Sequence, residues 1–148
     1  MKSYFVVLCA LFTLGSCSKD VVTVEEQFTI DSQLIEDYLK SKNITAEKTF
    51  DGVYYVIENS GGDIKPKITN TLTVTYKGYF LDGVIFDSAE KAVFPLSVTI
   101  QGWQIGMPKF GKGGKGKLFS PSKWAYGTSA QPGRSNAVLV FDIEIFDF

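Results

Sequence analysis

The chain has 148 residues, of which 45% are hydrophobic and 14% aromatic, so it can build one compact domain with an appendage. Its net charge of −1 excludes the concentrated basic surface that nucleic-acid binding requires. The absence of histidine removes the imidazole base, the Ser-His and Cys-His nucleophile pairs and most zinc sites.

The N-terminal segment has the pattern of a targeting sequence. Lys2 supplies a positive end, and residues 4–14 form an apolar run that is too short to span a bilayer comfortably. The run ends in Leu14-Gly15-Ser16-Cys17, which is typical of a bacterial lipobox. We predict a lipoprotein signal peptide over residues 1–16 and lipidation of Cys17. The lipid would anchor the protein in the bacterial cell envelope, at the outer membrane or facing the periplasm rather than the cytoplasm. An ordinary signal peptide with an incidental cysteine is the alternative.

The mature chain is expected to begin with a tether and a helical extension. Residues 17–30 are polar and β-branched without periodicity, which predicts a tether. Residues 31–48 are predicted to form a helical extension, with Asp31 or Ser32 as the N-cap. One face of this helix is apolar and carries Leu34, Ile35, Tyr38 and Leu39. Such a stripe favours packing against the helix's own domain, and a partner-binding helix is the alternative.

From Thr49 onward the pattern is mostly β. Strands are indicated over residues 52–57, 71–77, 84–87, 94–100, 117–120 and 137–145. Residues 102–108 can hold only a short helix, because Gly106 and Pro108 limit its length. Half-buried strands with one short helix predict an α+β fold in which a curved antiparallel sheet wraps that helix.

The segment Val74–Ser88 is the most informative part of the chain. Alternating residues lead into Asp82-Gly83, a pair that favours a tight hairpin, and the second strand reaches Phe86 followed by Asp87. A carboxylate among apolar side chains is either desolvated or hydrogen-bonded, and both outcomes indicate a binding cleft. Capping of a turn is the alternative role for Asp87.

A glycine-rich segment superficially resembles a phosphate-binding loop. Residues 111–118 read G-K-G-G-K-G-K-L, but Leu118 replaces the hydroxyl residue that follows the lysine of such a loop. The segment also leads into a predicted strand, whereas phosphate loops open a helix. We therefore predict a solvated turn and no nucleotide site.

Six motifs in series resemble the FK506-binding-protein family of peptidyl-prolyl cis-trans isomerases. The resemblance runs from about Gly52 to the C-terminus and identifies residues 49–148 as an isomerase domain of the compact bacterial form. The motifs are V-T-Y-K-G-Y-F-L-D-G-V-I-F-D-S, F-P-L, V-T-I-Q-G-W, G-K-G-K-L, W-A-Y-G and A-V-L-V-F-D-I-E-I.

The resemblance implies a pocket for proline. Its catalytic residues would be Tyr76, Phe86, Asp87, Ile100, Trp103, Tyr126 and Phe141, and its substrate-binding residues Phe94, Leu96 and Thr99. In this reading Phe86 is a hydrophobic wall, Asp87 a buried acid, Trp103 the floor and Phe141 the closing aromatic. The Ile100 amide and the Tyr126 phenol would bind a substrate carbonyl. Without the resemblance, packing in the core explains Phe94, Leu96, Trp103 and Phe141 equally well.

The implied reaction suits a chain without histidine, because rotation about an X-Pro bond makes and breaks no covalent bond. We expect no cofactor and no metal, and as partners proline-containing polypeptides, FK506-like macrolides and, through Cys17, a membrane. The sequence departs from the family at Pro132-Gly133-Arg134-Ser135-Asn136, where the usual aliphatic residue is missing. A non-catalytic proline-binding or chaperone module is therefore the alternative function.

Overall fold

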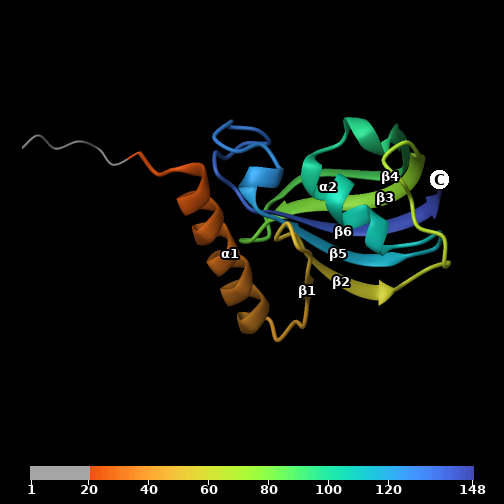
Figure 1. Ribbon diagram of the computed structural model, residues 1–148, viewed down its shortest axis with the longest axis horizontal. Coiled ribbons are helices and arrows are strands. Elements are labelled where there is room, and N and C mark those ends of the chain that lie inside the picture. The colour runs from red at the N-terminus through yellow and green to blue at the C-terminus, as the bar shows by residue number, and fades with distance from the viewer. Residues whose placement is uncertain (1–20) are drawn as a thin grey trace, which may run out of the picture.

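The computed structural model describes residues 21–148 (Figure 1). The strands are β1 (Glu47–Lys48), β2 (Tyr54–Asn59), β3 (Thr71–Phe80), β4 (Ile85–Pro95), β5 (Lys115–Ser120) and β6 (Leu139–Asp147). The α-helices are α1 (Val24–Ser41) and α2 (Gln101–Gly106), and the 3-10 turns are η1 (Leu96–Val98), η2 (Met107–Lys109) and η3 (Ser122–Trp124).

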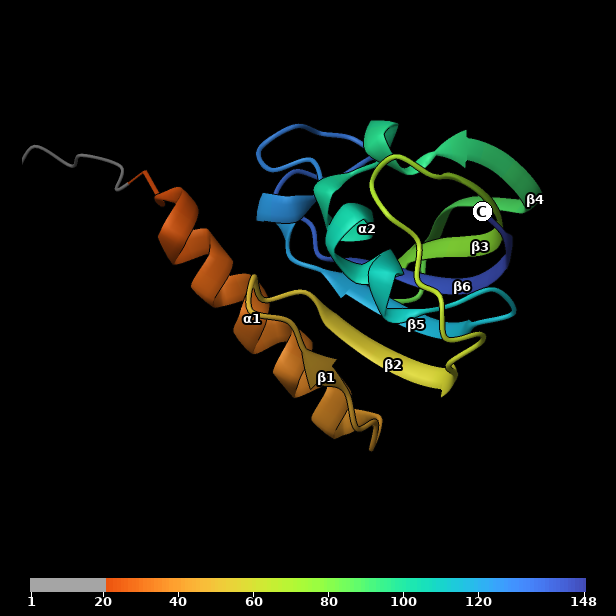
Figure 2. The ribbon, with the colours of Figure 1, turned by 45° about the vertical axis from the view of Figure 1, so that its right-hand side comes forward.

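The six strands form one antiparallel sheet in the order β1-β2-β5-β6-β3-β4. The sheet curves around α2, as Figure 2 shows, so the predicted α+β fold with a sheet wrapping a short helix is confirmed. The hairpin between β3 and β4 turns at residues 81–84, where Gly83 adopts a left-handed φ of 86° and its N–H donates to the Phe80 carbonyl at 2.8 Å. This turn is the one predicted from Asp-Gly.

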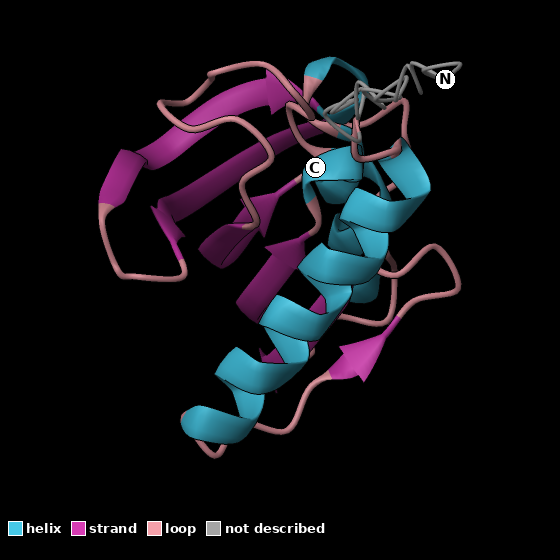
Figure 3. Ribbon diagram, turned by 90° about the vertical axis from the view of Figure 1, so that its left-hand side faces the viewer, coloured by secondary structure: helices cyan, strands magenta, loops and turns pink. Residues whose placement is uncertain are grey.

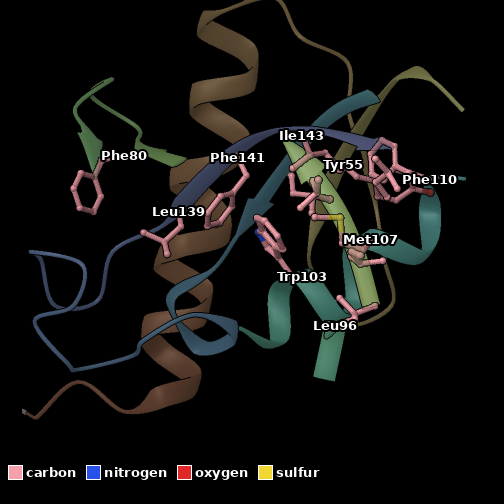
Figure 4. Packing of buried hydrophobic residues seen from close by; sticks show 13 residues of the cluster. Tyr55, Phe80, Leu96, Trp103, Met107, Phe110, Leu139, Phe141 and Ile143 are labelled. Atoms are coloured by element: carbon pink, nitrogen blue, oxygen red, sulfur yellow. The ribbon is translucent and has the colours of Figure 1, made fainter. Parts of the chain in front are cut away.

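One hydrophobic core fills the concave side of the sheet, between the strands and α2. Trp103 of α2 and Met107 of η2 belong to this core together with Phe141 of β6 (Figure 4). Leu118 of β5 belongs to the same core. The helix lies close to the strands because Gly106 faces Leu118: a Cβ on Gly106 would lie 2.6 Å from Leu118 Cδ2. Only glycine permits that distance, so this position fixes the depth at which α2 sits.

A second core lies on the opposite face of the sheet, beneath α1. Figure 3 shows α1 running across this face of the strands. Ile35 and Leu39 of α1 contact Phe119 and Val140, whose neighbours Leu118 and Phe141 point into the first core. Successive residues of a strand point to opposite faces, so β5 and β6 are buried on both sides where α1 covers them.

The helix α1 begins earlier than the sequence indicated. Thr23 is its N-cap and forms a capping box with Glu26, so residues 24–30 of the expected tether are helical and the prediction of Asp31 or Ser32 as N-cap is wrong. The helix ends at Ser41, and β1 at residues 47–48 already belongs to the sheet.

The buried face of α1 also differs from the expected one. Asp31, Ile35 and Leu39 are buried at four-residue spacing, whereas Leu34 is 46% exposed. Asp31 is thus a buried acid in this face instead of a cap. Its partners are described below.

The strand expected over residues 94–100 is also shorter than predicted. β4 ends at Pro95, and η1 follows, because proline cannot donate a hydrogen bond to extend the ladder. The glycine-rich segment leads into β5, in agreement with the rejection of a phosphate loop.

The predicted signal peptide over residues 1–16 and the lipidated Cys17 lie outside the described residues. Within residues 21–148, neither helix is both long and apolar enough to cross a bilayer.

The packing of α1 predicts unequal effects for two neighbouring residues. Ile35→Ala should lower the free energy of unfolding by about 3 kcal/mol, because Ile35 is fully buried between α1 and the sheet. Leu34→Ala, the matched control, should change it by no more than about 0.5 kcal/mol, since half of that side chain is in solvent. Urea unfolding followed by tryptophan fluorescence measures both values. Equal losses would mean that α1 does not pack on the sheet through this face.

Candidate functional site

An aromatic pocket of about 430 Å³ opens on the concave side of the sheet, between α2 and the β3–β4 hairpin. It brings together residues from β3, β4, η1, α2, β6 and the loop after η3. Its lining consists of Tyr76, Phe86, Asp87, Phe94, Val98, Thr99, Ile100, Trp103, Tyr126 and Phe141. Nine of the ten predicted pocket residues therefore line one cavity.

Trp103 forms the floor of this pocket. Its ring meets Tyr76 at 5.1 Å and Phe141 at 5.2 Å, with interplanar angles of 88° and 82°. Such edge-to-face pairs are favourable beyond simple burial and hold the rings at fixed angles. The Trp103 indole N–H is buried without an acceptor within the described residues. An unpaired buried donor costs stability, so the floor is not optimised for stability alone.

The side wall depends on a glycine that the sequence did not single out. Gly78 of β3 lies opposite both Asp87 of β4 and Phe141 of β6. A Cβ on Gly78 would come within 2.6 Å of the Phe86 ring and 3.0 Å of Phe141. Its missing side chain lets Phe86 and Phe141 meet across β3 at 5.7 Å and 86°. A glycine inside a strongly alternating strand is the sequence signal that could have indicated this close approach.

A tyrosine–carboxylate pair braces the rim. The Tyr76 hydroxyl donates to Asp87 Oδ2 at 2.7 Å. Burial of the phenol, followed by its hydrogen bond to Asp87 and the negative charge of that residue, raises the pKa of Tyr76 to about 12. The prediction that Asp87 is a buried acid is wrong: the residue is exposed, because β4 is the edge strand of the sheet.

Two hydrogen-bond donors face the mouth of the pocket. Ile100 is the N-cap of α2, and its backbone N–H donates to no acceptor within residues 21–148, as is usual at the start of a helix. Tyr126 is 41% exposed and lines the pocket from the other side. Both positions were predicted to bind a substrate carbonyl, and the structure brings them to the same cavity.

Leu96 is the one predicted residue that does not line the pocket. It is fully buried in the core of the domain, since η1 turns the chain after Pro95 and directs Leu96 inward (Figure 4). The assignment of Leu96 as a substrate contact is therefore not supported. Val98, two residues later in the same turn, lines the pocket and is 72% exposed; an apolar residue at the end of a presumed strand gave no signal of this.

The unusual loop at residues 132–136 does not line the pocket. Arg134 forms an ion pair with Asp82 of the β3–β4 turn at 2.7 Å, and its guanidinium lies 4.2 Å from the centre of the Phe80 ring. These contacts fasten the loop to the hairpin. The loop thus supplies no aliphatic side chain to the pocket, and its Arg134 contacts the β3–β4 hairpin outside the pocket instead.

A larger depression of about 660 Å³ lies on the outer face of the sheet. Three of its charges are paired with one another: Asp142 binds Lys117 at 2.6 Å and Lys77 at 3.2 Å, and accepts from the Tyr79 hydroxyl at 2.9 Å. These bonds outweigh the burial of the carboxyl and lower the pKa of Asp142. The depression is lined mainly by charged and polar side chains, whereas the aromatic pocket is mostly apolar with a few polar groups, as ligand sites usually are, so the aromatic pocket is the candidate site.

Comparison with known proteins agrees with this geometry. The family model described as FKBP-type peptidyl-prolyl cis-trans isomerase matches residues 62–146. The FKBP-type peptidyl-prolyl cis-trans isomerase FkpA of Aeromonas hydrophila is 42% identical over 117 residues, which cover 74% of this chain and 44% of that protein. The chain thus spans less than half the length of this relative.

Solved structures show the same fold. The crystal structure of FkpA from Escherichia coli superposes with a TM-score of 0.71 at 32% identity, covering 83% of this chain and 63% of that one. A peptidyl-prolyl cis-trans isomerase from Pseudomonas syringae gives a TM-score of 0.72 at 25% identity, covering 86% and 96%. From the matched family model, the shared fold and the aromatic pocket together, the chain belongs to the FKBP-type peptidyl-prolyl cis-trans isomerase family.

Proposed function

We propose that this protein accelerates cis-trans rotation about X-Pro bonds in polypeptides, with the aromatic pocket as its active site. The observation that carries the proposal is the combination, in one cavity, of an apolar aromatic floor and two hydrogen-bond donors at the rim. A proline ring fits the floor, and the donors suit the carbonyls of the chain on either side of it.

The pocket favours rotation because it excludes water from the substrate amide. The barrier of about 18–20 kcal/mol arises because rotation breaks the resonance of the amide. The twisted amide is less polar than the planar one, so water stabilises the planar form more. A pocket walled by Trp103, Tyr76 and Phe141 removes that water and thereby lowers the barrier.

The donors at the rim hold the substrate in a rotated shape. The Ile100 N–H and the Tyr126 hydroxyl are available for substrate carbonyls, and neither needs to transfer a proton. Asp87 acts as an acceptor that fixes the Tyr76 hydroxyl, rather than as a base. The reaction therefore proceeds without the imidazole that this chain lacks.

We also propose that the substrates are proline-containing segments of exported proteins and that FK506-like macrolides compete for the same pocket. Slow X-Pro isomerisation limits folding wherever chains fold after export. FkpA of Aeromonas hydrophila is longer than this chain, so the parts of that relative outside the match do not inform the choice of substrate.

The central test is a protease-coupled proline-tetrapeptide assay on the full chain. Asp87→Val should lower kcat/KM by about ten-fold, because it removes the acceptor that orients Tyr76, and Phe86→Tyr should also lower it. Asp87→Asn should lower kcat/KM less, since an amide oxygen still accepts a hydrogen bond. If Asp87 were a general base, both substitutions would lower kcat/KM equally. Glu90→Gln, a change at another acid of the same edge strand, is the control and should leave kcat/KM unchanged.

Two outcomes would contradict the proposal. Unchanged rates in Asp87→Val and Phe86→Tyr would remove the reaction from this pocket. Binding of proline peptides or of a macrolide without acceleration by the wild-type chain would favour a non-catalytic module, for which the altered loop at residues 132–136 is the supporting observation.

The rim pair predicts a measurable titration. Asp87→Asn should lower the pKa of Tyr76 from about 12 but leave it above that of a free tyrosine, because burial is the larger cause. Since the pKa is raised in the folded state, Tyr76 stabilises the fold below about pH 10, and this contribution is lost between about pH 10 and pH 12. NMR of the tyrosine ring carbons measures the change. Tyr79, whose pKa is raised by burial and by Asp142, is the internal control and should not respond; an unaltered Tyr76 titration would mean that the pair does not form.

We further propose that Cys17 carries lipid and holds the domain on an envelope membrane, because Leu14-Gly15-Ser16-Cys17 matches a lipobox. Cys17→Ser should abolish incorporation of labelled fatty acid in a bacterial host and move the protein from the membrane to the soluble fraction. Cys9→Ser, which leaves the lipobox intact, should retain both properties. Equal labelling of the two variants would indicate that the fatty acid is not attached at Cys17.

A further inference from the structure

The helix α1 carries a fully buried carboxylate that the proposed reaction does not use. Asp31 Oδ2 accepts from the backbone N–H of Ser122 at 2.7 Å and from its hydroxyl at 2.5 Å, while Oδ1 accepts from the Gln27 amide at 2.8 Å. Hydrogen bonds to an ionised, buried carboxylate are among the strongest in proteins. Asp31 therefore holds Ser122 firmly, although 91 residues separate them.

Ser122 in turn holds the residues on both sides of Tyr126. Its carbonyl accepts from the backbone N–H of Ala125 at 3.0 Å and from that of Gly127 at 2.9 Å. Gly127 has a left-handed φ of 54°, which completes a tight turn around the tyrosine. Ser122 thus donates two hydrogen bonds to Asp31 of α1, while its carbonyl accepts two from the turn that carries Tyr126.

The tyrosine depends on this turn because little else holds it. Its side chain is 41% exposed, and its hydroxyl makes no hydrogen bond within the described residues. The other pocket aromatics are fixed by each other: Trp103 and Phe141 are nearly buried and packed edge to face. The direction of the Tyr126 side chain is therefore set mainly by its backbone.

Two exposed contacts strengthen the same junction. Lys123 Nζ lies 2.7 Å from Glu25 Oε1 of α1, and the Trp124 indole N–H donates to the Asp51 carbonyl at 2.7 Å. The surface ion pair contributes little by itself. The attachment of η3 to α1 therefore depends mainly on the hydrogen bonds of the buried Asp31.

We propose that Asp31 is a positioning residue for Tyr126, acting through Ser122, so that α1 belongs to the catalytic unit. This inference rests on the proposed function, in which the Tyr126 hydroxyl donates to a substrate carbonyl. Asp31 touches no substrate; it keeps the turn at residues 122–127 in the geometry that aims the phenol at the pocket. An acid that only attached α1 to the domain would affect stability and not this turn.

A double-mutant cycle tests the route through Tyr126. In the full chain, Asp31→Asn should lower kcat/KM by about five-fold, because the neutral amide removes the charge that strengthens the bonds to Ser122 and leaves one acceptor oxygen for three donors. In a Tyr126→Phe background the same change should lower it by less than about two-fold, since no hydroxyl remains to be aimed. Equal losses in the two backgrounds, or no loss in the wild type, would overturn the proposal.

A second readout does not depend on activity. Hydrogen exchange measured by NMR should accelerate at the Ala125 and Gly127 amides of Asp31→Asn by about ten-fold more than at the amides of β5. Glu36→Gln is the matched control: Glu36 also accepts a hydroxyl from the sheet, that of Tyr54 at 2.6 Å, but it has no contact with η3. It should alter neither the local exchange nor kcat/KM, and an equal effect in this control would overturn the proposal.

A milder substitution allows the same test if Asp31→Asn prevents folding. If Asp31→Asn does not fold, Ser122→Ala can replace it, because it removes only one of the two donors to Asp31. It should accelerate exchange at the same amides and show the same non-additivity with Tyr126→Phe, both by a smaller factor. Uniform exchange or additive losses would overturn the proposal. If the wild-type chain does not accelerate X-Pro rotation, the proposed function fails, and exchange confined to Ala125 and Gly127 would alone support the role of Asp31 in holding the turn.

Discussion

The pocket depends on how closely α2 approaches the sheet. Gly102 and Gly106 face the strands, where a side chain would collide with Ser120 and Leu118. This closeness lets Trp103 contact both Tyr76 of β3 and Phe141 of β6. An alanine at either glycine would lift the helix, and the indole would leave the ring pairs that define the floor. The shape of the site therefore depends on the absence of a side chain at Gly102 and Gly106.

The sheet joins this pocket to α1 through adjacent residues. Phe141 points into the pocket and Val140, its neighbour in β6, into the core beneath α1. The link between Asp31 and Ser122 makes a second connection between the two sides. The helix that precedes the family domain is thus bound to it by apolar packing and by a buried charge. A description of the active unit that begins at β2 would omit part of what holds the site.

The sequence predicted features that depend on local chemistry or on the order of motifs. Asp82-Gly83 predicted the hairpin, alternation predicted the strand before it, and nine of the residues that the resemblance named line one cavity. The Thr23–Glu26 capping box was readable but was missed. Asp31 could not have been predicted as buried, because an acid before an apolar run is equally typical of a cap and its partner Ser122 is distant in sequence. The exposure of Asp87 and the burial of Leu96 depend on the sheet edge and on η1, which no local pattern specifies.

The strand order has a consequence for how the molecule is assembled. Among the strands of residues 21–148, β6 is the last in sequence, yet it lies between β5 and β3 and is the only strand that joins the pair β2–β5 to the pair β3–β4. Until it is inserted, the two halves have no hydrogen bonds to each other and both present open edges. Such long-range closure is slow, and open edges invite association with other chains. During its own synthesis, this member of the peptidyl-prolyl isomerase family is itself vulnerable to association until β6 is in place.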